Sequence, residues 1–252
     1  MKLTTQFLCC ILVSTVACQC VTMAKAVQNE NSIVCARAVS SDVHALTIGS
    51  SPGTPFENAV SLAALQGNIP ELAREIRVAR KHNSLRYMQK WLNTALFYAI
   101  TADRVDSAEF LINSGAQLNQ RAMYMQLPWN RQILHSKHPT LTQAGTPLAT
   151  AVTCGRVHMV DLLLNRGADM YTRDSGLNPE HRGNIIYAAV LSRFSPLVDA
   201  FLKHGLNPCE VTGRKSRGRE YTLAMVASEY GMSKTMQSNL TCKSALLPPS
   251  AR

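Results

Sequence analysis

A repeating unit constrains the fold of this chain more than any other feature of its sequence. The clearest copy is residues 145–169, GTPLATAVTCGRVHMVDLLLNRGAD, and four other stretches align with it. These four stretches start at Asn58, Asn93, Gly183 and Tyr221. The turn in the middle of each copy falls at Gly67, Asp103, Gly155, Arg193 and Gly231, at spacings of 36, 52, 38 and 38 residues. A period of this size is typical of units that stack on one another.

Each copy has the pattern of two helices joined by a tight turn. In the clearest copy, Thr146 and Pro147 suit the start of a helix, because Thr caps free backbone N–H groups and Pro has no N–H to leave unpaired. Gly155 suits the turn, since glycine adopts positive φ without strain. Apolar residues recur at helical spacing over 157–164, and Gly167 ends the second helix. Such a pair of helices cannot bury both of its apolar faces alone, so we expect neighbouring copies to share a core.

This pattern resembles the ankyrin repeat. The resemblance rests on Thr-Pro-Leu at 146–148, the Gly155 turn, Val-Asp-Leu-Leu-Leu at 160–164 and Gly-Ala-Asp at 167–169. It covers residues 56–236 and implies an all-α fold, an ankyrin-repeat solenoid of about five helix-turn-helix units. An aromatic content of only 6% agrees with packed helices. Asp103 and Arg193 depart from the pattern, because glycine is expected at both turns, and we expect the backbone there to be either strained or reshaped.

A long insertion separates the second and third units. It spans residues 121–144 and carries Trp129 and Arg131 among other aromatic, methionine and basic residues. Long loops in compact domains often have a function, and Trp and Arg are enriched where proteins bind each other most tightly. The insertion is therefore a candidate contact with a partner. The alternative is a lid that folds back on the solenoid and buries its own aromatic side chains.

The charge of the chain points to an acidic partner. Lys and Arg number 26 against 16 Asp and Glu, which gives a formal net charge of +10. Four of the cations lie in the short segment 213–219, GRKSRGR, which we expect to be a mobile, solvated loop before the last unit. A basic helix near the first repeat adds a second positive surface: Arg74, Arg77, Arg80, Lys81, Arg86 and Lys90. Nucleic acid is not expected as a partner, because the basic residues are not interleaved with aromatic ones and no reader motif is present.

The first 26 residues have the pattern of an export signal. Lys2 precedes an apolar stretch at 7–17, and Ala24-Lys25-Ala26 fits a signal-peptidase site. Two alternatives stay open, namely acylation at Cys18 as a lipoprotein and an uncleaved membrane anchor. All three place the rest of the chain outside the cytoplasm, either periplasmic or secreted. We expect a linker at 27–55 and a tail at 237–252, which is frayed from Asn239 onward.

Four cysteines remain after the signal: Cys35, Cys154, Cys209 and Cys242. An even number in a compartment that permits disulfides allows three pairings, and the sequence does not choose among them. The alternative is free buried thiols, which fits Cys154 in particular because it lies inside a repeat.

No group of residues suggests catalysis or a metal site. The sequence has no nucleophile elbow and no glycine-rich phosphate loop. His135 and His138 lie three residues apart, but no carboxylate or cysteine stands at ligand spacing beside them. We expect no cofactor, no metal and no enzymatic activity.

The predicted function is that of an exported, non-catalytic scaffold that binds a protein. The resemblance implies binding through the concave face, which is the groove formed by the first helices and the loop tips. The candidate contact residues are Gln66, Thr101, Trp129, Arg131, Thr153, Ser192, Arg214, Lys215, Arg217, Arg219, Tyr221 and Tyr230. Two alternatives stay open, namely an inhibitor or immunity-like protein that neutralises an acidic toxin or enzyme, and an accessory factor of a periplasmic enzyme.

Overall fold

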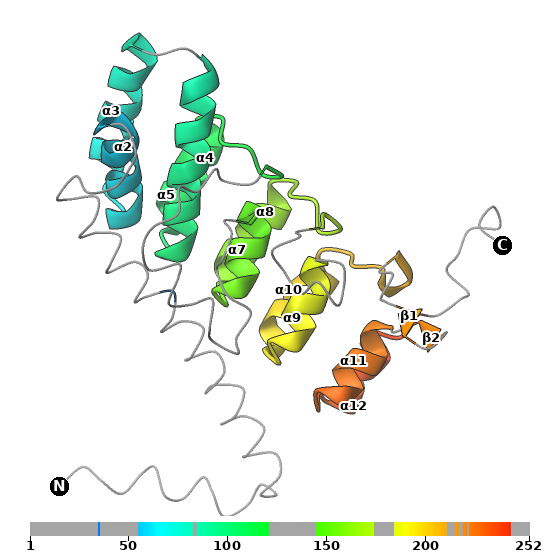
Figure 1. Cartoon of the computed structure of the whole chain (residues 1–252). Helices are drawn as coiled ribbons and strands as arrows, with labels where there is room; N and C mark the ends of the chain where they lie inside the picture. Colours follow the sequence, from blue (N-terminus) through cyan, green and yellow to red (C-terminus); the bar gives the residue numbers. More distant parts are fainter. Residues whose placement is uncertain are drawn as a thin grey trace, which may run out of the picture.

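Pairs of antiparallel helices follow one another in a row in the computed structural model of the chain (Figure 1). The structure describes Cys35 and residues 55–82, 85–120, 145–173, 184–210, 215–216, 219–220 and 222–242. The predicted signal at 1–26 and insertion at 121–144 lie outside these residues. So do His135 and His138, most of the predicted linker and the end of the predicted tail.

The described helices form five pairs, each made of a first and a second helix. The first helices are α2 (Pro55–Gln66), α4 (Leu85–Thr101), α7 (Pro147–Thr153), α9 (Ile185–Leu191) and α11 (Leu223–Glu229). The second helices are α3 (Ile69–His82), α5 (Val105–Asn113), α8 (Val157–Asn165), α10 (Ser195–Lys203) and α12 (Lys234–Asn239). A short 3-10 helix, η2 (Pro208–Glu210), follows α10. The expected all-α solenoid of helix-turn-helix units is thereby confirmed.

Side-chain caps fix the starts of the later first helices. The Thr146 hydroxyl accepts a hydrogen bond from the Ala149 N–H at 3.3 Å, and Pro147 occupies the first helical position. Asn184 caps α9 in the same way, and Thr222 caps α11. These caps satisfy backbone N–H groups that have no partner inside the helix. The role predicted for Thr146 and Pro147 is confirmed.

The turn between the two helices of every pair requires a left-handed backbone. The turn residue has φ of 77° at Gly67, 67° at Gly155 and 71° at Gly231. Asp103 and Arg193 adopt the same conformation, with φ of 58° and 56°. Residues with a Cβ pay for this conformation in steric strain. The strain expected at these two turns is therefore present, and the turns keep the geometry of the glycine turns rather than being reshaped.

One continuous hydrophobic core runs through the stack. First helices pack on first helices, in the order α2, α4, α7, α9 and α11, and second helices pack similarly from α3 to α10. Small residues such as Ala95, Ala151 and Ala189 are buried between the first helices, where they permit close approach of the backbones. Tyr187 and Phe201 are the largest side chains that are fully buried. Each unit thus shares its core with its neighbours, as solenoid stability requires.

Polar contacts also join successive second helices. Arg166, directly after α8, contacts Glu109 and Asn113 of α5. One unit further along, Asp161 of α8 receives Lys203 and His204, with Nζ and Nε2 at 3.3 Å and 2.9 Å from its Oδ1. These contacts hold neighbouring units in register on the side of the stack away from the first helices.

The Asp161 contacts predict a loss of stability in acid. Burial raises the pKa of Asp161, but the hydrogen bonds with His204 and Lys203 outweigh burial, so the pKa is lowered from its usual value of 3.8. A lowered folded-state pKa contributes stability that is present above about pH 4 and is lost as the pH falls through the folded-state pKa. We expect Asp161→Asn to lower the free energy of unfolding by about 1 kcal/mol at pH 6, and by less at pH 3.

Urea unfolding at several pH values checks this expectation. Asp199→Asn is the matched control, because Asp199 is an exposed carboxylate on α10. The control should leave stability nearly unchanged at both pH values. An Asp161→Asn variant whose stability differs from that of the wild type equally at pH 6 and pH 3 would contradict the role of the charge.

Two segments depart from the predicted boundaries. Lys215–Ser216 (β1) and Arg219–Glu220 (β2) form a small antiparallel hairpin, with Ser216 opposite Arg219, where we expected a mobile loop. The predicted tail at 237–252 begins too early, because α12 runs to Asn239, Leu240 is fully buried, and Cys242 is disulfide-bonded. The loop expectation was wrong because strands of only two residues are too short to leave a recognisable pattern in this basic segment.

Candidate partner-binding surface

The ends of the first helices form the candidate surface. We call the two residues that precede each turn the first-helix row: Leu65–Gln66, Thr101–Ala102, Thr153–Cys154, Leu191–Ser192 and Glu229–Tyr230. Because the turns share one backbone geometry and the first helices stack in order, these pairs recur at equivalent places along the array.

Arginines of one unit bond to the row of the preceding unit. Arg104 donates from Nε to the carbonyl oxygen of Leu65 at 3.2 Å. Arg156 donates from Nη2 to the carbonyl oxygen of Thr101 at 3.3 Å. Both arginines occupy the same place in the repeat, directly after the turn residue, and both reach a backbone carbonyl near the end of a first helix. These bonds satisfy helix-end carbonyls that have no partner within their own helix.

Two further contacts join side chains at the turns of neighbouring units, along the same edge of the stack as the row. Arg156 also forms an ion pair with Asp103, with Nη1 at 3.6 Å from Oδ2. The Arg193 guanidinium lies over the ring of Tyr230, 5.4 Å from its centroid. None of these links between units was predicted from the sequence. Arg recurs directly after the turn residue in the second and third units, and this recurrence could have predicted that Arg104 and Arg156 play equivalent roles.

The described row residues differ in exposure. Gln66 is exposed, Thr153, Ser192 and Tyr230 are half-buried, and Thr101 is only 3% exposed. Thr101 is therefore not available as the surface contact that we predicted. Its hydroxyl donates to the carbonyl oxygen of Tyr98 at 3.0 Å, within its own helix. The correction has a simple cause, since helical periodicity alone does not show how closely the next unit packs on the end of α4.

Short hydroxyl side chains in the row are already hydrogen-bonded. The Thr153 hydroxyl donates to the carbonyl oxygen of Ala149 at 2.8 Å. The Ser192 hydroxyl donates to the carbonyl oxygen of Ala189 at 2.7 Å and accepts from the Phe194 N–H at 3.3 Å. A partner that contacts Thr153 or Ser192 would meet side chains whose hydroxyl protons are already engaged. Among the candidate contacts described in the row, Gln66 and Tyr230 are thus best placed to recognise a partner.

A disulfide closes the middle of the row. Cys154 is bonded to Cys35, 119 residues earlier in the chain, with the two Cα atoms 5.8 Å apart. Both residues are 1% exposed and form a small cluster of their own, separate from the main core. Of the five residues that directly precede a turn, Cys154 alone is fully buried. The chain's own Cys35 therefore occupies the centre of the row, and the free-thiol alternative for Cys154 is wrong.

The opposite ends of the units are also joined to each other. The Asn119 side chain accepts from the Asp169 N–H at 2.9 Å, and the Tyr171 hydroxyl accepts from the Asn207 N–H at 3.0 Å. A second disulfide, Cys209–Cys242, joins the segment after α10 to the residues after α12. The structure therefore selects one of the three cysteine pairings that the sequence left open.

The remaining candidate residues divide into two groups. Lys215 and Arg219 lie in the paired strands β1 and β2, close to the start of the last unit. The others lie outside the described residues, and their role stays a prediction: Trp129, Arg131, Arg214, Arg217 and Tyr221.

Neither a metal site nor a membrane-spanning helix is found in the part of the chain that the structure describes. No group of three or more His, Cys, Asp or Glu side chains there is arranged to hold a metal ion. None of the helices described there combines the length and the apolar character needed to cross a membrane.

The described architecture is that of a repeat protein in which stacked helical hairpins present one edge of first-helix ends. Residues 91–122 and 145–175 match the family model of the ankyrin repeat. The matches include the α7–α8 pair, α5 and all of α4 except residues 85–90. The fold is therefore an ankyrin-repeat solenoid, and ankyrin repeats are non-catalytic scaffolds that bind other proteins. Comparison with curated proteins finds no significant match.

Proposed function

We propose that this chain is an exported, non-catalytic scaffold that binds an acidic protein partner along the first-helix row. The observation that carries the proposal is the ankyrin-repeat stack itself, whose family binds proteins. Gln66 at one end of the row is exposed, and Tyr230 at the other end is half-buried. Both residues therefore offer side chains to a partner on either side of the Cys35–Cys154 disulfide.

The cysteines support export. All four cysteines that follow residue 26 are paired in disulfides, Cys35 with Cys154 and Cys209 with Cys242. Disulfides persist in oxidising compartments and are rare in the cytosol. Together with the pattern of the first 26 residues, this pairing favours a periplasmic or secreted protein. The intact mass of the protein from an exporting host distinguishes cleavage after Ala26 from acylation at Cys18 and from a retained anchor.

The net charge supports an acidic partner. A formal charge of +10 attracts carboxylate-rich surfaces and speeds their association. Lys215 and Arg219 on the β1–β2 hairpin are candidate contacts, together with Arg214, Arg217 and Tyr221. We propose the same role for Trp129 and Arg131 in the insertion. Raising the salt concentration should weaken binding, because salt screens contacts between exposed charges.

Affinity capture with paired charge variants tests the first-helix row. The double variant Gln66→Glu, Tyr230→Glu places two carboxylates on the row, where they repel an acidic partner. We expect it to retain less than about one tenth of the captured protein, since each factor of ten corresponds to about 1.4 kcal/mol. The control is His158→Glu, Asn165→Glu, which adds the same charge at two exposed positions of α8.

The control should capture as much partner as the wild type. Equal capture by the row variant and the wild type would overturn the proposal, and so would equal loss in the row variant and the control. Circular dichroism should show that both variants keep the helical content of the wild type. The identity of the captured protein decides whether the scaffold acts as an inhibitor of an acidic toxin or enzyme, or as an accessory factor of a periplasmic enzyme.

A further inference from the structure

The helices α3 and α4 are much longer than their counterparts in the other units. The second helix α3 has 14 residues, against 9 in α5, α8 and α10. The first helix α4 has 17 residues, against 12 in α2 and 7 in α7, α9 and α11. At 1.5 Å per residue, α4 is about 15 Å longer than the later first helices. Figure 1 shows α3 and α4 reaching beyond α5 at the same end of the array.

Two hydrogen bonds mark the level at which α3 and α4 leave the stack. Arg80 of α3 donates to the carbonyl oxygen of Ser114 at 3.4 Å, and Gln89 of α4 donates to the carbonyl oxygen of Gly115 at 2.8 Å. Ser114 and Gly115 directly follow the last residue of α5. Lys81 and Tyr87, which lie past these bonds toward the ends of α3 and α4, therefore project beyond the neighbouring unit.

The base of this projection is packed. Met88 and Trp91 of α4 are 7% and 3% exposed. Tyr87, directly before Met88, is 59% exposed. One face of the helix thus holds α4 against the core while the other presents a large aromatic side chain to solvent. An exposed aromatic ring on a helix anchored in this way is a contact typical of binding surfaces.

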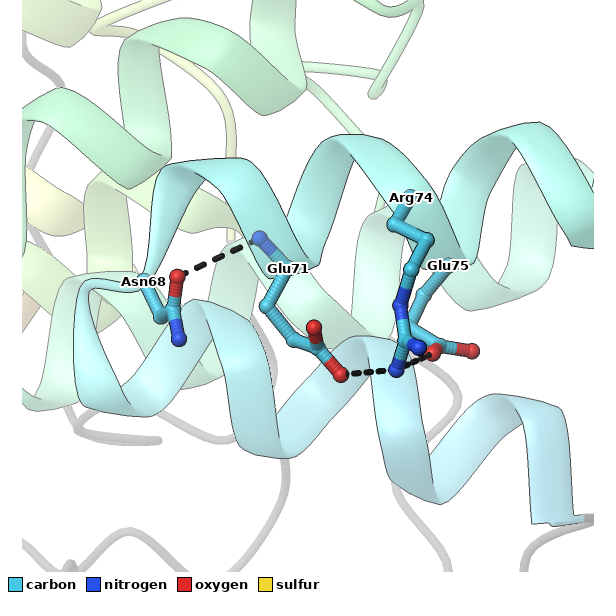
Figure 2. A network of polar contacts seen from close by, with 4 residues as sticks. All are labelled: Asn68, Glu71, Arg74 and Glu75. Atoms are coloured by element: carbon cyan, nitrogen blue, oxygen red, sulfur yellow. Dashed lines mark hydrogen bonds and ion pairs between the residues drawn. The ribbon is translucent and has the colours of Figure 1, made fainter.

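The expected single basic helix is wrong, because its residues are divided between two helices: Arg74, Arg77, Arg80 and Lys81 on α3, and Arg86 and Lys90 on α4. The outer face of α3 is basic, and its charges differ in how they are neutralised. Figure 2 shows the Arg74 guanidinium between the carboxylates of Glu71 and Glu75, while Asn68 accepts from the Glu71 N–H at the start of the helix. The hydrogen bond to Glu71, with the nearby charges of Glu71 and Glu75, raises the pKa of Arg74 above its usual range. The charge of Arg74 is therefore neutralised by carboxylates of its own helix.

Arg77 and Lys81 carry the remaining charge of this face. They lie three and seven residues after Arg74, so the three share one side of the helix. Both are exposed, and within the described residues neither forms an ion pair or a side-chain hydrogen bond. Their unneutralised positive charge therefore extends along α3 to its projecting end, where Lys81 and the exposed ring of Tyr87 lie. We call Arg77, Lys81 and Tyr87 the basic tip.

We propose that the basic tip is a second docking surface, which binds a carboxylate-rich segment of a protein. The proposal rests on the proposed function and extends it, since it places the acidic partner, or a segment of it, on the tip as well as on the row. Arg77 and Lys81 supply charge complementarity, and Tyr87 supplies an apolar contact. A flat anionic membrane against the whole helix would also meet Glu71 and Glu75, whereas a peptide confined to the tip meets only the cations.

A labelled hexaglutamate peptide tests the proposal by fluorescence anisotropy with the purified full-length protein. The tip variant is Arg77→Glu, Lys81→Glu, and the matched control is His158→Glu, Asn165→Glu, Lys234→Glu, which changes the net charge equally at exposed positions of α8 and α12. We expect the Kd to rise about tenfold in the tip variant, because two attractive charges become repulsive. The control should raise the Kd less than about threefold. Tyr87→Ala should weaken peptide binding even at high salt, because salt screens the charges but not the apolar contact.

Equal loss of peptide binding in the tip variant and the control would overturn the proposal, because it would show a response to net charge alone. Loss of binding to vesicles of phosphatidylglycerol and phosphatidylcholine in the tip variant, with peptide binding unchanged, would also overturn it and assign the tip to a membrane. Failure of the row proposal can be distinguished from failure of the tip proposal, because Gln66→Glu, Tyr230→Glu leaves the tip residues unchanged. A row variant that loses partner capture but still binds hexaglutamate places the failure in one surface only.

Discussion

Removal of the Cys35–Cys154 disulfide is expected to lower the free energy of unfolding by about 5 kcal/mol. The bond closes a loop across 119 residues, and such a loop loses more conformational entropy in the unfolded chain than a short one does. The Cys209–Cys242 bond spans 33 residues, so its removal should cost about 4 kcal/mol. The long disulfide should also matter more for the shape of the array, because it attaches Cys35 to the middle of the first-helix row.

Urea unfolding of two double variants measures the difference. Cys35→Ala, Cys154→Ala removes the long link without leaving a free thiol, and Cys209→Ala, Cys242→Ala is the matched control for the short one. Alanine is the right replacement, because serine would leave an unpaired hydroxyl where Cys35 and Cys154 are buried. A variant without the long link that is within about 1 kcal/mol of the wild type would mean that the folded protein does not contain this bond.

The regular third unit could be predicted from the sequence in detail. Thr146, Pro147, Gly155 and Gly167 each have a backbone role that only a few residue types perform well, so their spacing fixes where both helices begin and end. The structure places α7 and α8 between these residues as expected. Local chemistry determines local structure here, which is why one repeat was enough to identify the fold.

Contacts between distant parts of the chain could not be predicted in the same way. The four cysteines allowed three pairings, because sequence spacing says nothing about which Sγ atoms meet after 119 or 33 intervening residues. The burial of Thr101 depends on how closely the next unit packs against α4. The extra turns of α3 and α4 were also not predicted. The five copies were aligned over the length that they share, and this alignment gives no information about helices that continue past it.

The same reasoning explains why the candidate surface was predicted only in part. The repeat pattern located the first-helix row correctly, because the row follows from the turn positions. It did not show that Cys35 covers the middle of the row, or that Thr153 and Ser192 use their hydroxyls inside their own helices. Those facts depend on side-chain geometry, and they leave Gln66 and Tyr230 as the described residues most able to give specificity.

Truncation of Phe201 is expected to lower the free energy of unfolding by about 3–5 kcal/mol. Phe201 lies on α10, is fully buried, and belongs to the continuous core. Phe201→Ala leaves a cavity where α10 packs against α8 and α9. In a solenoid each unit contacts only its neighbours, so a cavity in the fourth unit also weakens the coupling of α11 and α12 to the rest of the stack.

Hydrogen exchange and urea unfolding check both parts of this prediction. Amides of α11 and α12 should lose more protection in Phe201→Ala than those of α4, because α4 keeps all of its neighbours. Leu202→Ala is the control, since Leu202 is the next residue of α10 but is only half-buried, and it should cost less than about 2 kcal/mol. An equal cost for the two substitutions would contradict the expected effect of burial at Phe201. A uniform loss of protection along the whole array would contradict the coupling of neighbours, because it would mean that all units unfold together.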